Sequence, residues 1–485
     1  MNRAAVLGLL ALSAWHVGLR LYGWKLPLLF DEGDYAYSAR VWSEGGLPYR
    51  DAFDQKPPMI HFLYRAPVPP RLLATAASLG TMVLLYLSVP AGWSAAARLT
   101  AAAAYGVLST TPVGDLGWPA NTEVFLNLFM ALAAFAWTRK KTALCGLACG
   151  AALMTKQTAL WAVLVFAGLS FSPAYWLGAA AVPAAFAVYF AARGGLPWLL
   201  QDAFGRNLGY ASIVSSPGDL AKQMRWFFGG LGPDLAKGDW PFWATALLGL
   251  GKSPIERKPN FELMVTLWLA GSALGVVTGW FLFPHYFLQA YAALALACAV
   301  GVERLGKPWL LLALTLYAPL VRAKAYFLDP PEVTARKLLY PNPLYEAREI
   351  GAYLKRATRP EDKIYVFGSE SQIYVYADRR CATRHSYIYP LTLFPRGFDE
   401  GGEELKALEA SPPKAVVYSA QPFSTLVGSQ AGWAFREAFK DFLKRRYRWT
   451  GTVIVKADGA DYDLGRPRGG SPDFDDPRAL FVFER

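Results

Sequence analysis

The segment from residue 30 to residue 59, FDEGDYAYSARVWSEGGLPYRDAFDQKPPM, places six carboxylates and a lysine directly after an apolar stretch. These side chains are Asp31, Glu32, Asp34, Glu44, Asp51, Asp54 and Lys56. A carboxylate can take the proton of an attacking hydroxyl group, and a lysine can neutralise the oxygen of a departing phosphate. The segment therefore carries the groups needed to displace a phosphate from carbon.

The apolar residues between Tyr35 and Trp42 recur at roughly helical spacing, and Gly45-Gly46 ends the pattern. We predict a short helix at a membrane surface, with Asp31 and Glu32 in its first turn, where the helix dipole stabilises negative charge. A purely structural role as a helix cap is the alternative for Asp31.

Lys56 directly precedes Pro57-Pro58, which prevents a helix and predicts a rigid turn or extended backbone. A lysine held there suits the phosphate of a lipid headgroup, because its ammonium acts as a compact point charge. Simple contact with membrane headgroups is the alternative.

The composition is that of a polytopic membrane protein, since 54% of the 485 residues are hydrophobic and 15% are aromatic. Apolar residues dominate positions 1–321, whereas 322–485 has the mixed composition of a soluble domain, and we predict two domains with these bounds. The net charge of +12 arises mainly in the first part, which favours basic cytoplasmic loops over nucleic-acid binding. No nucleic acid is expected as a partner.

Apolar runs long enough, or nearly long enough, to cross a bilayer predict the membrane passes. They occur at 4–22, 71–91, 95–112, 121–138, 142–170, 173–192, 224–251, 261–283, 284–302 and 308–321. The run 142–170 contains MTKQT at its centre, and a lysine at mid-bilayer is costly unless it faces protein or water.

Basic clusters at 139–141, 256–258 and 303–307 should share the cytoplasmic side, which requires an even number of crossings between the first two. We therefore expect two short passes broken near Lys156, and 11 to 13 passes in all. With a cytoplasmic N-terminus, the first outer loop (23–70), the segment 193–223, Lys156, His285 and the C-terminal domain face the same outer compartment.

Other motifs are weaker. Cys145, Cys149 and Cys298 lie in apolar segments and Cys381 in the tail, which excludes a disulfide framework. Residues 4–19 are expected to remain as the first helix, because no small-x-small cleavage site follows. Carboxylates at 458–477 alternate without the closing glutamate of an EF-hand, so a mobile polar loop is expected there, and neither a metal nor another cofactor is firmly implied.

Four sequence motifs, taken in their order along the chain, resemble those of the GT-C glycosyltransferases, particularly the branch of protein O-mannosyltransferases and lipid A aminoarabinose transferases. They are DEGDYAYSARVWSEGGLPYRDAFDQKPP from Asp31, ANTEVFLNLF at 120–129, MTKQTAL at 154–160 and FPHYFLQAY at 283–291. The resemblance implies a GT-C fold and an inverting transferase. Its donor would be a polyprenyl (undecaprenyl) phosphate sugar, and its acceptor a lipid, glycan or protein at the outer face of the inner (plasma) membrane.

The resemblance also implies roles for residues of this chain. Asp31 would be the base, with Glu32 beside it and Lys56 near the donor phosphate, and Glu123 would be the second acidic site, with Asp115 competing for that role. Lys156 would either hold phosphate or stabilise the broken helix pair. The expected substrate-binding set is Tyr35, Arg40, Gln55, Lys56, Asn121, Glu123, Lys156, His285, Tyr286 and Gln289.

Two places depart from the family pattern. YRAPVPPRLL at 64–73 replaces a smooth helix entry and predicts a short second pass, and no role is carried over to Asp34. The C-terminal domain contains no catalytic motif, and we predict that it is an extracytoplasmic α/β domain. Its strands are expected at 363–367, 415–419, 452–456 and 480–484, and its helices within 342–357 and near 433–446.

Two other functions remain open. In a transporter or lipid flippase, the loop acids and Lys156 would line a translocation path. Against this reading, no inverted repeat is visible and the acids gather at one predicted face. A scaffold that binds lipid carriers without catalysis is the third reading.

Overall fold

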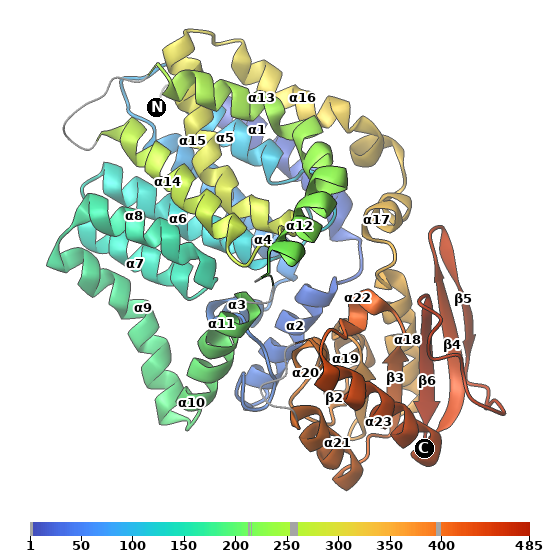
Figure 1. The fold of residues 1–485 in the computed structure, drawn as a ribbon. Coiled ribbons are helices and arrows are strands. Elements are labelled where there is room, and N and C mark those ends of the chain that lie inside the picture. Colours follow the sequence, from blue (N-terminus) through green and yellow to red (C-terminus); the bar gives the residue numbers. More distant parts are fainter. Residues whose placement is uncertain (1–2, 212–213, 215, 253–259, 394–398) are drawn as a thin grey trace.

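The computed structural model describes residues 3–211, 214, 216–252, 260–393 and 399–485. A large helical bundle and a smaller α/β domain lie side by side, and the segment around α17 (Pro331–Leu339) connects them (Figure 1). The basic cluster at 256–258, used above to orient the passes, lies outside the described residues.

Within the described residues, four helical segments are long and apolar enough to cross a membrane, judged by length and composition. They are α1 (Arg3–Trp24), α4 (Pro70–Ser88), α9 (Pro173–Ala192) and Pro284–Leu305, which joins η4 (Pro284–Phe287) to α15 (Leu288–Leu305). Shorter apolar helices are α5 (Ala95–Leu108), α6 (Thr122–Thr138), α7 (Thr142–Leu153), η1 (Gln157–Ala159) with α8 (Leu160–Ser170), α14 (Phe261–Val277) and α16 (Leu310–Val321). The chain is a multi-pass membrane protein.

The remaining segments of the bundle connect or flank these helices. They are α2 (Phe30–Ser43), α3 (Met59–Tyr64), α10 (Leu196–Trp198), η2 (Leu199–Gly205), α11 (Arg206–Ala211), α12 (Pro217–Trp226), η3 (Phe227–Leu231), α13 (Gly232–Leu250) and η5 (Lys324–Leu328).

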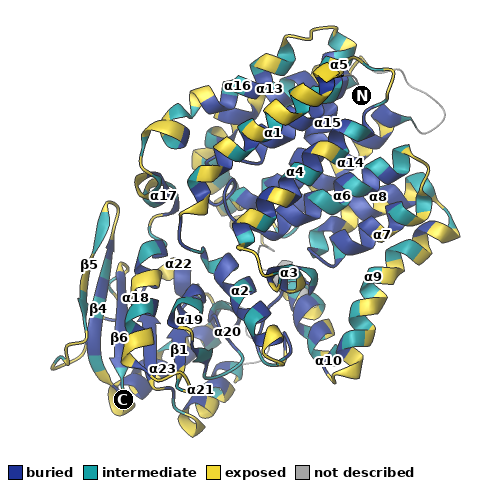
Figure 2. Ribbon diagram, turned by 180° about the vertical axis from the view of Figure 1, so that it is seen from behind, coloured by how far each residue is buried: buried dark blue, intermediate teal, exposed yellow. Residues whose placement is uncertain are grey.

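Helix α15 is the central helix of the bundle. In the apolar span that contains it, 94% of the residues are buried, compared with 11% of those in the apolar span of α9. Figure 2 shows the same contrast between a dark interior and an exposed α9. Small residues permit the close packing of α15, as is usual between membrane helices. A Cβ atom at Gly301 would lie 2.2 Å from the carbonyl oxygen of Thr245 in α13.

The structure tests two predictions about single passes. The run 142–170 is broken at Lys156 as predicted, since α7 ends at Leu153 and α8 begins at Leu160. The prediction of a short second pass is wrong, because α4 has 19 residues and begins at Pro70. Proline is well accommodated at the first helical position, where its missing N–H has no partner to lose.

A six-stranded sheet forms the centre of the C-terminal domain, in the order β2-β1-β3-β6-β4-β5. Strands β1, β2 and β3 are parallel, and β3, β6, β4 and β5 pair antiparallel. Their bounds are β1 (Lys363–Phe367), β2 (Arg380–Cys381), β3 (Ala415–Ser419), β4 (Arg448–Lys456), β5 (Gly459–Leu464) and β6 (Ala479–Glu484). The helices are α18 (Leu344–Ala357), α19 (Gln372–Ala377), α20 (Tyr389–Thr392), α21 (Glu400–Ala410), α22 (Pro422–Thr425) and α23 (Gln430–Arg446).

Alternation along β1 organises the core of this domain. Tyr365 and Phe367 contact Phe439 of α23, with ring centroids 5.6 and 4.5 Å apart. The four predicted strands and both predicted helices are confirmed. The prediction of a mobile loop at 458–477 is wrong for its first part, because residues 459–464 form β5, whose backbone pairs with β4 and fixes the carboxylates at the sheet edge.

Helix α2 belongs to both domains. Tyr35 and Ala39 pack in the core of the bundle, whereas Tyr37 and Val41 pack in the core of the C-terminal domain. The two surfaces meet closely at Gly33, where a Cβ atom would lie 2.4 Å from the backbone nitrogen of Gln372 in α19. The predicted surface helix therefore exists, but protein covers it on two sides.

Candidate functional site

The side chain of Asp31 lies in the first turn of α2 and is half-buried. Burial raises its pKa above the usual value of an aspartate. The opposite charges that act most strongly on it belong to Lys56 and His285, followed by the like charges of Asp115 and Glu123. Charged groups that are far apart in the sequence therefore act on one carboxylate.

Lys56 is held by its backbone as well as by the prolines that follow it. Oδ1 of Asp54 accepts the N–H groups of Gln55 at 2.6 Å and of Lys56 at 2.9 Å. The hydroxyl group of Tyr49 donates to the carbonyl oxygen of Lys56 at 2.8 Å. Sequence reasoning noted the rigidity but missed Asp54 and Tyr49 as its causes.

A buried polar group lies where α6, the α7–α8 connection and the start of α15 meet. The ammonium of Lys156 donates to Oε1 of Glu123 and lies 3.9 Å from the ring centroid of Tyr286. Nε2 of His285 is 4.0 Å from the same carboxylate, and its Nδ1 is 2.5 Å from Oδ2 of Asp115. Both acids that competed for the second acidic role thus flank His285.

Glu32 is bound on every side by protein groups. Its carboxylate accepts two hydrogen bonds from the guanidinium of Arg71, at 2.9 and 2.5 Å. The same oxygens accept the N–H groups of Leu29 at 3.0 Å and Ala120 at 2.9 Å. Arg71 also donates to the carbonyl oxygens of Gly23, Leu26 and Pro27. This arrangement favours a positioning role for Glu32 over the catalytic role expected from the sequence.

Three residues of the expected substrate-binding set lie within the helical bundle. Tyr35 packs edge-on against Tyr64, with ring centroids 5.5 Å apart. Oε1 of Gln289 accepts a hydrogen bond from Thr158 at 2.9 Å. Asn121 precedes the first turn of α6 and is 2% exposed, and neither polar atom of its side chain has a hydrogen-bond partner within the described residues.

Two further residues of this set, Gln55 and Arg40, contact the C-terminal domain. The amide nitrogen of Gln55 donates to the hydroxyl group of Tyr389 at 2.6 Å. The guanidinium of Arg40 donates to the carbonyl oxygens of Tyr374 and Arg379 and pairs with Asp378 at 3.2 Å. The structure thus engages Arg40 at the interface with α19, and its contact with the donor phosphate stays a prediction.

The arrangement combines carboxylates with several basic side chains. Asp31 can accept a proton, while Lys56, Lys156 and His285 can stabilise negative charge nearby. Within the described ranges, no group of three or more His, Cys, Asp or Glu side chains is placed to hold a metal ion. The residues named here can carry out acid–base chemistry and stabilise negative charge.

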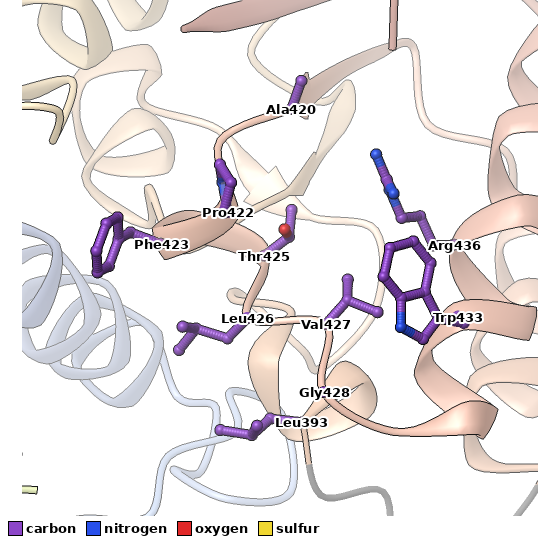
Figure 3. Close-up of a pocket in the computed structure, with 10 residues that line it drawn as sticks. All are labelled: Leu393, Ala420, Pro422, Phe423, Thr425, Leu426, Val427, Gly428, Trp433 and Arg436. Atoms are coloured by element: carbon purple, nitrogen blue, oxygen red, sulfur yellow. The ribbon is translucent and has the colours of Figure 1, made fainter. Parts of the chain in front are cut away.

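A separate pocket of about 390 Å³ opens on the C-terminal domain, beside α22 and α23 (Figure 3). Trp433 and Arg436 form one wall, and the guanidinium carbon of Arg436 lies 5.1 Å from the Trp433 ring centroid. The pocket is lined by none of the charged residues described above, which are Asp31, Lys56, Glu123, Lys156 and His285.

Comparison with solved structures defines the architecture. ArnT from Cupriavidus metallidurans bound to undecaprenyl phosphate is similar over 100% of this chain and 98% of its own, with a TM-score of 0.54 and 13% identity. The apo oligosaccharyltransferase from Archaeoglobus fulgidus is similar over 97% of this chain and 75% of its own, with a TM-score of 0.51 and 12% identity. No family model and no curated protein matches the sequence. The chain therefore has the fold of the GT-C glycosyltransferases, as the four sequence words predicted.

Proposed function

We propose that this protein is an inverting glycosyltransferase that moves a sugar from a polyprenyl-phosphate carrier to an acceptor hydroxyl group, with Asp31 as the general base. The shared GT-C fold supports a glycosyltransferase, and the ArnT structure of the same fold is bound to undecaprenyl phosphate. A lipid, glycan or protein could supply the hydroxyl group.

In the proposed reaction, Asp31 takes the proton of the acceptor hydroxyl group as its oxygen bonds to the anomeric carbon of the sugar. The bond between this carbon and the phosphate oxygen breaks, and its electron pair leaves with the polyprenyl phosphate. A single displacement from the opposite face inverts the configuration at the carbon. Lys56 and His285, whose charges reach Asp31, would stabilise the phosphate as its negative charge increases.

One observation carries the proposal: the charged residues meet at the same end of the bundle. Asp31 and Glu123 lie in the first turns of α2 and α6, and Lys156 lies between α7 and α8. Lys56 immediately precedes α3, and His285 lies in η4 just before α15. Alternating-access transport places its coupled residues near the bilayer midplane, so this placement favours a surface reaction.

The test uses purified protein in liposomes with a panel of radiolabelled polyprenyl-phosphate sugars and an envelope extract that supplies lipid and glycan acceptors. We expect acceptor-dependent release of polyprenyl phosphate, and Asp31→Asn should abolish it. Asp441→Asn is the matched control, because this carboxylate is 69% exposed on α23. Wild-type activity in the Asp31→Asn protein would remove Asp31 as the base, and transport without bond cleavage would replace the whole proposal.

We also propose that the site and the C-terminal domain face outward from the inner (plasma) membrane. Because the four native cysteines are all buried, introduced cysteines can report sidedness. A membrane-impermeant maleimide added to intact spheroplasts should label Lys406→Cys, at a position that is 74% exposed, but not Lys141→Cys between α6 and α7. The reverse pattern would place the site in the cytosol and contradict the proposal.

A further inference from the structure

We propose that Gln157 and Asn207 are positioning residues that fix Lys56 for binding the phosphate of the lipid-linked donor. The inference rests on the proposed function, in which Lys56 stabilises the phosphate as it leaves. Neither residue belongs to the substrate-binding set expected from the sequence. Both act on the backbone beside the lysine, and neither has to touch the ligand.

Two side-chain amides bind the same pair of backbone carbonyl groups. Nε2 of Gln157 donates to the carbonyl oxygens of Gln55 at 2.7 Å and of Ala203 at 2.5 Å. Nδ2 of Asn207 donates to the same two oxygens, at 2.8 Å each. Each amide nitrogen carries two hydrogens and each carbonyl oxygen two lone pairs, so four donors meet four acceptor positions. The arrangement is therefore complete without a water molecule or a ligand.

These four hydrogen bonds join three segments that are distant in the sequence. They connect the loop at 23–70 to η1 and to the η2–α11 segment. The N–H group of Met59 donates to the carbonyl oxygen of Met154 at 3.0 Å and joins the first two of these segments a second time. Residues 55 and 59 bracket Lys56, and residues 154 and 157 bracket Lys156. Each lysine-bearing segment is therefore fixed against the other at two points.

The backbone of Lys56 is held on both of its sides. The carbonyl group of Gln55 and the N–H group of Lys56 belong to one planar peptide unit, so hydrogen bonds at both ends fix its orientation. The amides bind the carbonyl end, and Oδ1 of Asp54 accepts the N–H group at 2.9 Å. On the other side, the hydroxyl group of Tyr49 donates to the carbonyl oxygen of Lys56 at 2.8 Å, and Pro57 restricts the lysine to extended backbone. Loss of the amides would release one end of this peptide unit.

A fixed backbone matters for this type of residue. Lysine presents a point charge on a flexible four-carbon stem, and binding a phosphate restricts that stem. Any additional freedom of the backbone would be lost at the same moment and would weaken binding. Gln157 and Asn207 thus increase the affinity for phosphate by ordering Lys56 before the ligand arrives.

The experiment measures binding without transfer. Full-length protein in nanodiscs is titrated with radiolabelled undecaprenyl phosphate and, separately, with undecaprenol, which has the same chain without the phosphate. Gln157→Met removes both donors at nearly the same side-chain size. We expect this variant to bind undecaprenyl phosphate roughly tenfold more weakly, and to bind undecaprenol within about twofold of the wild type.

A double-mutant cycle with Lys56→Gln tests whether the effect passes through the lysine. In the Lys56→Gln background, Gln157→Met should weaken binding of undecaprenyl phosphate by less than about twofold further, because the group that it positions is absent. An equal loss in both backgrounds would overturn the positioning role. Unchanged binding in the single variant, or an equal loss for undecaprenol, would do the same. If Gln157→Met does not fold, Asn207→Leu is read in the same way.

Gln201→Met is the matched control. It makes the same substitution in η2, at a side chain that forms no hydrogen bond within the described part of the chain. We expect it to bind undecaprenyl phosphate like the wild type, and a tenfold loss here would also overturn the inference. Failure of the wild type to bind undecaprenyl phosphate would instead contradict the proposed function itself.

Discussion

Glu32 and Arg71 form a two-pronged, buried ion pair where the loop at 23–70 meets α4. The guanidinium nitrogens lie 2.9 and 2.5 Å from the two carboxylate oxygens. Because Glu32 also accepts the N–H group of Ala120, the pair ties the start of α2 to the segment that leads into α6. It thereby fixes the position of Asp31 relative to Glu123.

We predict that Glu32→Gln lowers the free energy of unfolding by about 3 kcal/mol, because it leaves the guanidinium of Arg71 buried and unpaired. Arg71→Lys should be nearly as damaging, since an ammonium cannot form the same fork or reach three carbonyl oxygens. Thermal unfolding in detergent measures both. Glu349→Gln, in an exposed pair with Arg348, should change stability by less than about 1 kcal/mol. A neutral Glu32→Gln would show that the pair is not needed.

The acid limb of the pH profile should report Asp31. The proposed base works only when it is deprotonated, and burial raises its pKa. Activity should therefore fall, as the pH is lowered, at a higher pH than the value of about 4 typical of an exposed aspartate. The profile of kcat/KM against pH measures this in the free enzyme.

The variant Lys56→Gln tests the direction in which the pKa of the same carboxylate moves. Lys56 lowers the pKa of Asp31, so its removal should move the acid limb to still higher pH and weaken inhibition by polyprenyl phosphate by roughly tenfold or more. Lys25→Gln is the matched control, because Lys25 is an exposed lysine of the same loop. A shift to lower pH would contradict the assignment of the limb to Asp31.

A double-mutant cycle at Lys156 and Glu123 can separate the two roles left open for this lysine. Each single variant, Lys156→Met or Glu123→Gln, leaves one buried partner uncompensated and should destabilise the protein by roughly 3 kcal/mol. The double variant should recover part of that stability. Recovery of stability without activity would indicate that this ion pair acts on the substrates, whereas recovery of both would indicate a purely structural role.

The sequence predicted the fold class because it depends on strong, local signals. Single elements were specified by the long apolar runs, by the lysine inside 142–170 and by the alternating pattern of the tail strands. The four sequence motifs specified the GT-C fold. β5 was missed because none of the residues of GADYDL is buried, two of them are aspartates, and the strand depends on pairing with β4.

The site was predictable in its charged residues but not in their partners. Asp31, Lys56, Glu123 and His285 stand out as charges in or beside apolar segments. Arg71 and Asp54 could not be assigned, because their roles depend on contacts across the fold. The contacts of Arg40 could not be predicted for the same reason: its spacing from Asp31 does not reveal that α19 covers that side of α2.

Because α2 contributes alternate side chains to two different cores, the soluble portion is not an accessory that can be trimmed. Deleting residues 322–485 would leave Tyr37 and Val41 without the core into which they pack. Chimeras that exchange the tail between related enzymes would consequently need to carry a matching α2. Changes in the core of the tail are then constrained by the same helix that carries Asp31.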